Sequence, residues 1–240
     1  MAVLSVVGDN LPDDVKWAAV LAGVGILVIR VTMPESRPHP RRDLVLGDRN
    51  AFDDSPLSER LKRAKRVWIF APSAANVLSE QHVQIIRRHV LARESGHLRV
   101  VVLDPTVTPA VELAVRQLDE SLEFPRRNFR TDLALVVEEL CQMSRWDIRG
   151  KFSYRFLDYN PGFSIIALES DVSDDLVVVE FHGFHNESTA SRMHVEFTGE
   201  DNPRWYSYWT GQFEHIWENA RAPGSPPDDR RTTQAPPQTA

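Results

Sequence analysis

The chain has 240 residues, of which 42% are hydrophobic and 26% charged, a balance typical of a protein that buries a core. Acidic residues outnumber basic ones by 34 to 28, so the net charge of −6 does not favour nucleic acid as a partner. A single cysteine excludes an intramolecular disulfide framework and a thiol-rich zinc site. The composition therefore excludes a disordered, collagen-like or polytopic membrane protein, and it indicates no particular reaction.

The first 43 residues contain an apolar run. Residues 17–29 carry no charge, and Arg30 and three further residues extend the stretch to 33. Because Arg30 can snorkel towards lipid headgroups, this length reaches the lower limit for a membrane helix. We therefore expect residues 15–33 to form a single membrane-spanning helix, followed by a linker rich in proline and arginine that ends at residue 43.

Charges on the two sides of this run differ in sign. Four arginines follow it, whereas three aspartates and one lysine precede it. The positive-inside rule then places the larger C-terminal domain in the cytoplasm, with the chain crossing the membrane once. An alternative stays open, in which residues 17–29 dock against protein and the chain is a soluble cytoplasmic protein.

The following part of the chain predicts helices that alternate with strands. Apolar positions repeat every three or four residues in the helices, and short β-branched runs mark the strands. The predicted elements are a helix from Pro56, a strand at 67–71, a helix from Ser79 that Gly96 terminates, a strand at 98–103, and helices from Thr108 and at 131–144.

The second half is richer in strands. It predicts strands at 151–157, 163–168, 176–181 and 192–198, and a final helix at 203–222 whose aromatic residues we interpret as core. We expect an α/β fold in residues 44–221, with a mixed β-sheet and helices on both faces. The strands at 67–71, 98–103, 163–168 and 176–181 should be neighbours. Residues 222–240 hold five prolines and no large apolar side chain, so they should be disordered.

Four segments within residues 56–221 resemble a known family. They read, in order, LKRAKRVWIFAPSA, SGHLRVVVLDP, YRFLDYNPGFSIIALESD and YSYWTGQFEHIWENA. This succession resembles the phospholipase D-like domain family, in particular its degenerate bacterial members. The resemblance implies a phospholipase D-like fold with a cleft suited to phosphate-bearing ligands.

Active members of that family carry a His-x-Lys-x4-Asp motif. Its histidine attacks phosphorus covalently, and its lysine neutralises phosphate charge. No His-x-Lys occurs in this chain, and the matching strand at 163–171 has Ser164 and Ile166 in that stretch. A hydroxyl without a neighbouring base is a poor nucleophile, so we expect Ser164 to bind ligand and the protein to lack phosphodiesterase activity.

Two sets of residues keep a catalytic alternative open. His97, Arg99 and Asp104 reproduce the motif spacing with arginine for lysine, but they lie on an earlier strand than the family motif. His182 and His185 form the second set. Side chains three positions apart on one strand point to opposite faces, so no metal site is predicted there.

The sequence thus predicts a membrane-anchored, non-catalytic domain that binds or senses a phosphate-bearing ligand or a partner protein. Arg99, Arg155 and Ser164 are the expected ligand contacts, and no cofactor is expected. Two alternatives are a phosphodiesterase with a remodelled histidine site and a soluble protein-interaction module. The sequence leaves open whether the protein forms a homodimer.

Overall fold

The computed structural model describes residues 45–47, 56–120, 123, 128–171 and 175–225, all within the compact unit Leu44–Ala240. The predictions for residues 15–33 and for most of the tail therefore lie outside the described residues. Among the helices that are described, none combines the length and the apolar character needed to cross a bilayer.

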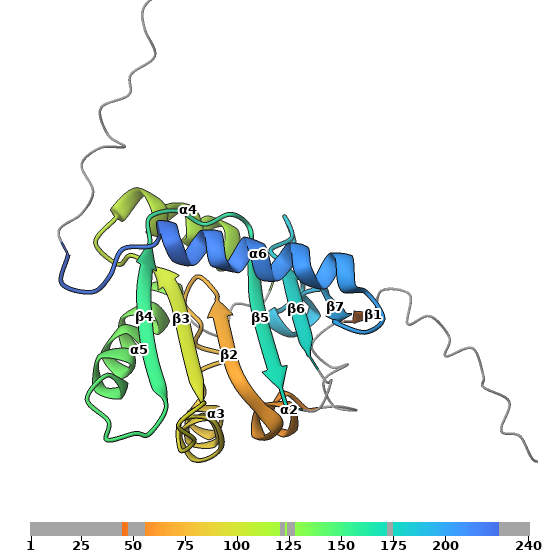
Figure 1. Cartoon of the computed structure of the whole chain (residues 1–240). Coiled ribbons are helices and arrows are strands. Elements are labelled where there is room, and N and C mark those ends of the chain that lie inside the picture. Colours follow the sequence, from red (N-terminus) through yellow and green to blue (C-terminus); the bar gives the residue numbers. More distant parts are fainter. Residues whose placement is uncertain (1–44, 48–55, 121–122, 124–127, 172–174, 226–240) are drawn as a thin grey trace, which may run out of the picture. The chain divides into compact units, whose positions relative to one another are not determined.

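A seven-stranded mixed sheet forms the centre of the described domain (Figure 1). Its strands are β1 (Val45–Gly47), β2 (Ala64–Phe70), β3 (His97–Leu103), β4 (Lys151–Leu157), β5 (Phe163–Ser170), β6 (Leu176–Phe181) and β7 (His194–Thr198), in the spatial order β1-β7-β6-β5-β2-β3-β4. The strands β2, β3 and β4 run parallel to one another, and every other pairing is antiparallel. The four strands expected to be neighbours occupy consecutive positions, which confirms that prediction.

Helices cover both faces of the sheet, as predicted. They are α2 (Leu57–Arg63), α3 (Glu80–Ile85), which continues into the π-helical turn η2 (Ile86–Val90), α4 (Thr108–Leu118), α5 (Phe129–Met143), the short η3 (Thr189–Ser191) and α6 (Pro203–Asn219). The Ser79 hydroxyl caps α3 by accepting a hydrogen bond from the His82 amide at 3.4 Å, which confirms the predicted start of that helix.

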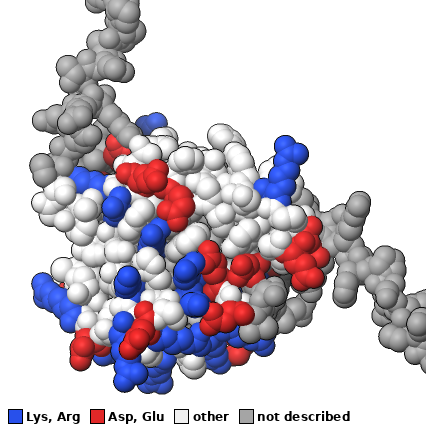
Figure 2. Space-filling view, in the orientation of Figure 1, with Lys and Arg blue, Asp and Glu red and all other residues white. Residues whose placement is uncertain are grey.

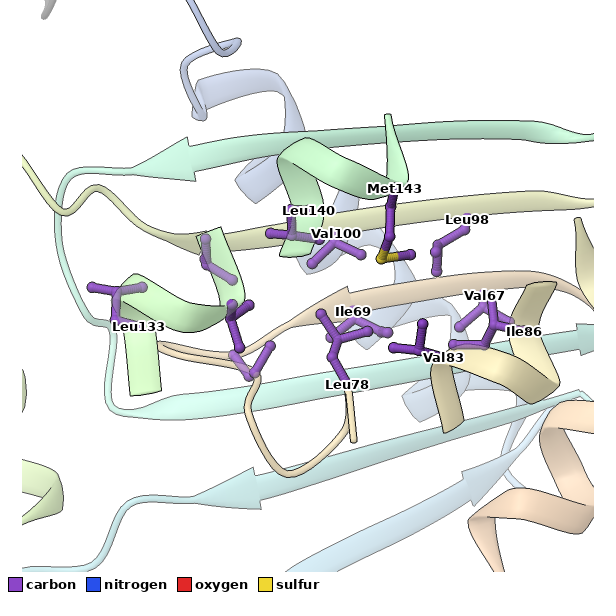
Figure 3. Close-up of a cluster of buried hydrophobic side chains, with 14 of the residues drawn as sticks. Val67, Ile69, Leu78, Val83, Ile86, Leu98, Val100, Leu133, Leu140 and Met143 are labelled. Atoms are coloured by element: carbon purple, nitrogen blue, oxygen red, sulfur yellow. The ribbon is translucent and has the colours of Figure 1, made fainter. Parts of the chain in front are cut away.

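The larger hydrophobic core lies between the sheet and helices α2 to α5. Figure 3 shows Leu98 and Val100 of β3 facing Leu140 and Met143 of α5. Leu98 and Val100 face the same side because alternate residues of a strand point to the same face of the sheet. All four side chains are buried.

Helix α6 covers the opposite face, where it crosses the strands (Figure 1). Phe213 is fully buried and stacks on Trp68 of β2, with 5.6 Å between ring centroids. Trp205 and Tyr208 near the start of α6 are 49% and 53% exposed. The interpretation of the α6 aromatics as core is therefore correct for Phe213 and wrong for the two exposed rings.

Candidate functional site

A small cleft opens where β2 ends and β5 begins. The antiparallel pairing places Phe70, the last residue of β2, beside Ile165 near the start of β5. Residues 71–77, which follow β2, form one wall, and Ser164, Glu180 and His182 lie on the other side. The cavity measures about 60 Å³. A water molecule occupies about 30 Å³ in the liquid, so this cleft holds only a small chemical group.

Two residues that the sequence indicated separately meet in this cleft. Ser164 Oγ lies 2.9 Å from His182 Nε2, a hydrogen-bonding distance. The two come together because the His182 amide donates to the Gly162 carbonyl at 2.9 Å, which continues the β5–β6 pairing past the end of β6. The expectation that no base lies near Ser164 is therefore wrong, since strand pairing supplies one from 18 residues away.

The buried side chain of Asn160 lies next to the other ring nitrogen of His182. The amide of Gly162 donates to Asn160 Oδ1 at 3.2 Å, so the Nδ2 group of Asn160 must be the part that faces His182. That nitrogen lies 2.7 Å from Gln117 Oε1 and 3.5 Å from His182 Nδ1. In the tautomer that carries its hydrogen on Nε2, His182 Nδ1 accepts from Asn160 and Nε2–H donates to the oxygen of Ser164.

This arrangement is opposite to that of an activated serine. A general base must accept the hydroxyl hydrogen, whereas here the ring nitrogen next to Ser164 donates its own. The hydrogen of the Ser164 hydroxyl is left available for an acceptor atom in the cleft. In this tautomer the pair offers a hydrogen-bond donor to a ligand.

Two side chains of opposite charge line the cleft, Arg192 and Glu180. Arg192 Nη1 lies 3.8 Å from Glu180 Oε1, and its Nη2 donates to the Leu118 carbonyl at 2.9 Å. Both side chains are largely buried, at 8% and 12% exposure. Because Arg192 balances the charge of Glu180, hydroxyl and amide groups supply the remaining donors.

The loop after β2 has an unusual backbone. Ala74 has a φ of 57°, the left-handed conformation that residues other than glycine rarely adopt. Within the described part of the chain, the amides of residues 73–76 donate no hydrogen bond. Strained residues of this kind cluster at binding and catalytic sites, and successive free amides favour anions. The sequence does not predict this loop conformation, because alanine is not a residue type that favours the left-handed region.

The structure does not bring His97, Arg99 and Asp104 together. They are spread along β3 from its first residue to the position after its last. Arg99 donates to both carboxylate oxygens of Glu214 on α6, at 2.8 and 2.9 Å. Burial, with the charges of Arg99 and Lys151, lowers the pKa of His97. The three residues therefore do not form one site.

Arg155 lies on the α6 face of the sheet, opposite to the face that carries Ser164. Its Nη1 donates to the Trp217 carbonyl at 2.7 Å, and its guanidinium lies 4.6 Å from the centre of that ring. Arg99 contacts the same ring at 5.1 Å. The role of Arg99 and Arg155 in ligand binding stays a prediction, and their present contacts hold α6 on the sheet.

The remaining histidine candidate, His185, is an exposed residue of the loop after β6. Among the described residues, no three histidine, cysteine, aspartate or glutamate side chains converge as metal ligands would. Neither a family model nor a curated protein matches this chain. The functional proposal therefore rests on the sequence and on the geometry of the cleft.

Proposed function

We propose that this protein is a membrane-anchored, non-catalytic domain of phospholipase D-like fold that binds a phosphate-bearing ligand in the Ser164–His182 cleft. The observation that carries the proposal is the hydrogen bond between Ser164 Oγ and His182 Nε2 at 2.9 Å. In the tautomer in which His182 donates in this bond, the serine presents its own hydrogen to the ligand.

The cleft suits one phosphate group better than a whole lipid or nucleotide. Its volume of about 60 Å³ admits a single small head group. Phosphate oxygens are acceptors only, and the cleft offers as donors the Ser164 hydroxyl and the amides of residues 73–76, which donate no hydrogen bond within the described part of the chain. The rest of such a ligand would extend into solvent.

Support for the phospholipase D-like family comes from the order of the four sequence segments and from the mixed sheet between helical layers. The strand that matches the family motif, β5, lies within this sheet beside β2. Ser164 stands near its start, in place of the family's nucleophile and with no lysine two residues later. These features favour a binding role over the phosphodiesterase alternative.

The test combines turnover with binding. We expect the purified full chain to hydrolyse neither bis(p-nitrophenyl) phosphate nor phosphatidylcholine. Inorganic phosphate should raise the melting temperature, and Ser164→Ala should weaken phosphate binding about tenfold, since a hydrogen bond to a charged group contributes about 1.5–3 kcal/mol. Ser207→Ala, at an exposed position of α6, is the matched control and should leave binding unchanged.

Two results would contradict the proposal. Robust hydrolysis that disappears in Ser164→Ala or His182→Ala would establish the phosphodiesterase alternative. Phosphate binding that is identical in the wild type and in Ser164→Ala would place the ligand elsewhere.

A further inference from the structure

A second, larger hollow lies at the other end of the sheet from the Ser164–His182 cleft. Figure 2 shows basic side chains gathered at the end of the molecule that carries α2 and α3. Beside them is a groove of about 550 Å³, which falls in the range of small-molecule sites. Arg87, Arg88 and Arg149 line it, and Ala92 and Ile148 provide apolar surface.

The two walls of this groove are fixed to each other through backbone contacts. One wall is η2 with the residues after it, and the other is the segment 147–149 that precedes β4. The Gly150 amide donates to the Leu91 carbonyl at 2.9 Å, and the Lys151 amide donates to the Gly96 carbonyl at 2.8 Å. The arginines of the groove therefore project from a rigid frame.

The wall formed by η2 has a rare backbone. The Leu91 amide donates to the Ile86 carbonyl at 2.9 Å, a bond across five residues that defines a π-helical turn. Such turns are uncommon and frequently occur at functional sites. Arg87 and Arg88 lie within this turn.

The arginines of the groove differ from the other basic residues at this end. Lys62 pairs with Glu59 and Arg66 pairs with Glu169, so those charges are compensated locally. Within the described part of the chain, Arg87, Arg88 and Arg149 form no ion pair. The guanidinium of Arg87 lies 4.8 Å from the centre of the Trp146 ring, which holds it at the groove's edge.

We propose that this groove binds a phosphate ester, with its phosphate on the guanidinium groups and its organic part on the apolar surface beside Trp146. Guanidinium groups present a planar fork of donors that matches phosphate oxygens. Asp147 also lines the groove, and its negative charge repels a phosphate there. The ester is either a soluble molecule or the headgroup of a phospholipid, since both present the same phosphate chemistry.

The experiment titrates the full-length protein with pyrophosphate, with adenosine monophosphate, and with phosphatidylcholine vesicles containing or lacking phosphatidylglycerol. Binding is followed by the indole N–H resonance of Trp146, with vesicle cosedimentation alongside. Arg87→Ala and Arg88→Ala should each weaken binding about tenfold, and Asp147→Asn should strengthen it by about twofold or more. Arg204→Ala, at an exposed position of α6, is the matched control and should change nothing.

Each outcome of this experiment has a defined meaning. A Trp146 shift with the soluble anions alone identifies a soluble ester, and a shift with phosphatidylglycerol vesicles but not with phosphatidylcholine vesicles identifies a lipid headgroup. Cosedimentation through the proposed anchor would be the same for both vesicles. The proposal fails if no probe shifts the Trp146 resonance, or if Arg87→Ala and Arg88→Ala bind as well as Arg204→Ala. Ser164→Ala should leave binding in this groove intact, so the result is independent of the other cleft.

Discussion

Asp104, which is 2% exposed, stands directly after β3 and accepts hydrogen bonds from Thr106 and from Arg221. The Arg221 Nε to Asp104 Oδ2 distance is 3.0 Å. Burial acts to raise the pKa of this carboxyl, but the hydrogen bonds from Thr106 and Arg221 outweigh burial and place its pKa below the ordinary value of 3.8. The carboxylate is therefore charged in the folded protein, and it fastens the segment after α6 to the sheet.

Removing the partner of this carboxylate should destabilise the fold. We expect Arg221→Ala to lower the free energy of unfolding by about 3 kcal/mol, because it leaves a buried charge without compensation. Urea denaturation at pH 7 measures the change. Asp147→Ala, at an exposed carboxyl, is the control and should have little effect. Equal stability of Arg221→Ala and the wild type would show that the ion pair contributes nothing.

The same carboxyl should make stability depend on pH. Its pKa is depressed by folding, so its stabilisation is fully present above 3.8 and is lost as the pH falls through the lower pKa of the folded state. The stability difference between the wild type and Asp104→Asn should therefore be constant from pH 5 to 7 and should shrink below about pH 4. A difference that grows on acidification would contradict the assigned sign.

At the scale of elements, Gly96 follows the helix formed by α3 and η2 for a steric reason. The sequence predicts Gly96 as the residue that terminates this helix, but the helix ends at Val90 and Gly96 does not have a positive φ. A Cβ atom at Gly96 would lie 1.8 Å from the Val90 carbonyl oxygen. Glycine is thus required at this position by a close backbone approach and not by a left-handed cap.

Two glycine substitutions with opposite expected signs test this interpretation. Gly96→Ala should destabilise the protein by about 3 kcal/mol, because backbone atoms must move to admit the methyl group. Gly211→Ala is the matched control within α6, where a Cβ atom meets nothing within 4 Å. It should stabilise the protein by about 1 kcal/mol, since glycine weakens a helix interior. Similar denaturation midpoints for the two variants would contradict the close-approach argument.

At the scale of the whole molecule, the membrane anchor is a proposal from the sequence alone. Residues 15–33 lie outside the described residues, and the anchor is proposed from their apolar run and the arginines after it. The full chain should remain in the membrane pellet after carbonate extraction, and deletion of residues 1–43 should release it. Solubility of the intact chain without detergent would favour the alternative in which residues 17–29 dock against protein.

The two hollows also belong to this scale, because each is assembled from distant segments of one sheet. The cleft follows the carboxyl end of β2, whereas the groove lies before the amino ends of β3 and β4. Since β2, β3 and β4 are parallel, these are opposite ends of the sheet. A ligand in one site would leave the other accessible.

The sequence by itself predicted most elements of this protein and four neighbouring strands of its sheet, but it did not predict β1. The strands 98–103 and 176–181 and the helix from Ser79 follow from apolar periodicity and capping, which depend on residues close together in the chain. Element ends were less well determined, since β2 begins at Ala64 and not at residue 67, and α6 ends at Asn219 and not at residue 222. Those ends depend on strand pairing and on the path of the adjoining loops.

Only the tertiary structure decided which polar residues meet. Ser164 and His182 are 18 residues apart, and their contact depends on the register of β5 against β6. Arg88 and Arg149 line one groove because backbone bonds join Leu91 to Gly150. No local pattern encodes such contacts, because strand register and loop path are determined by the packing of the whole domain.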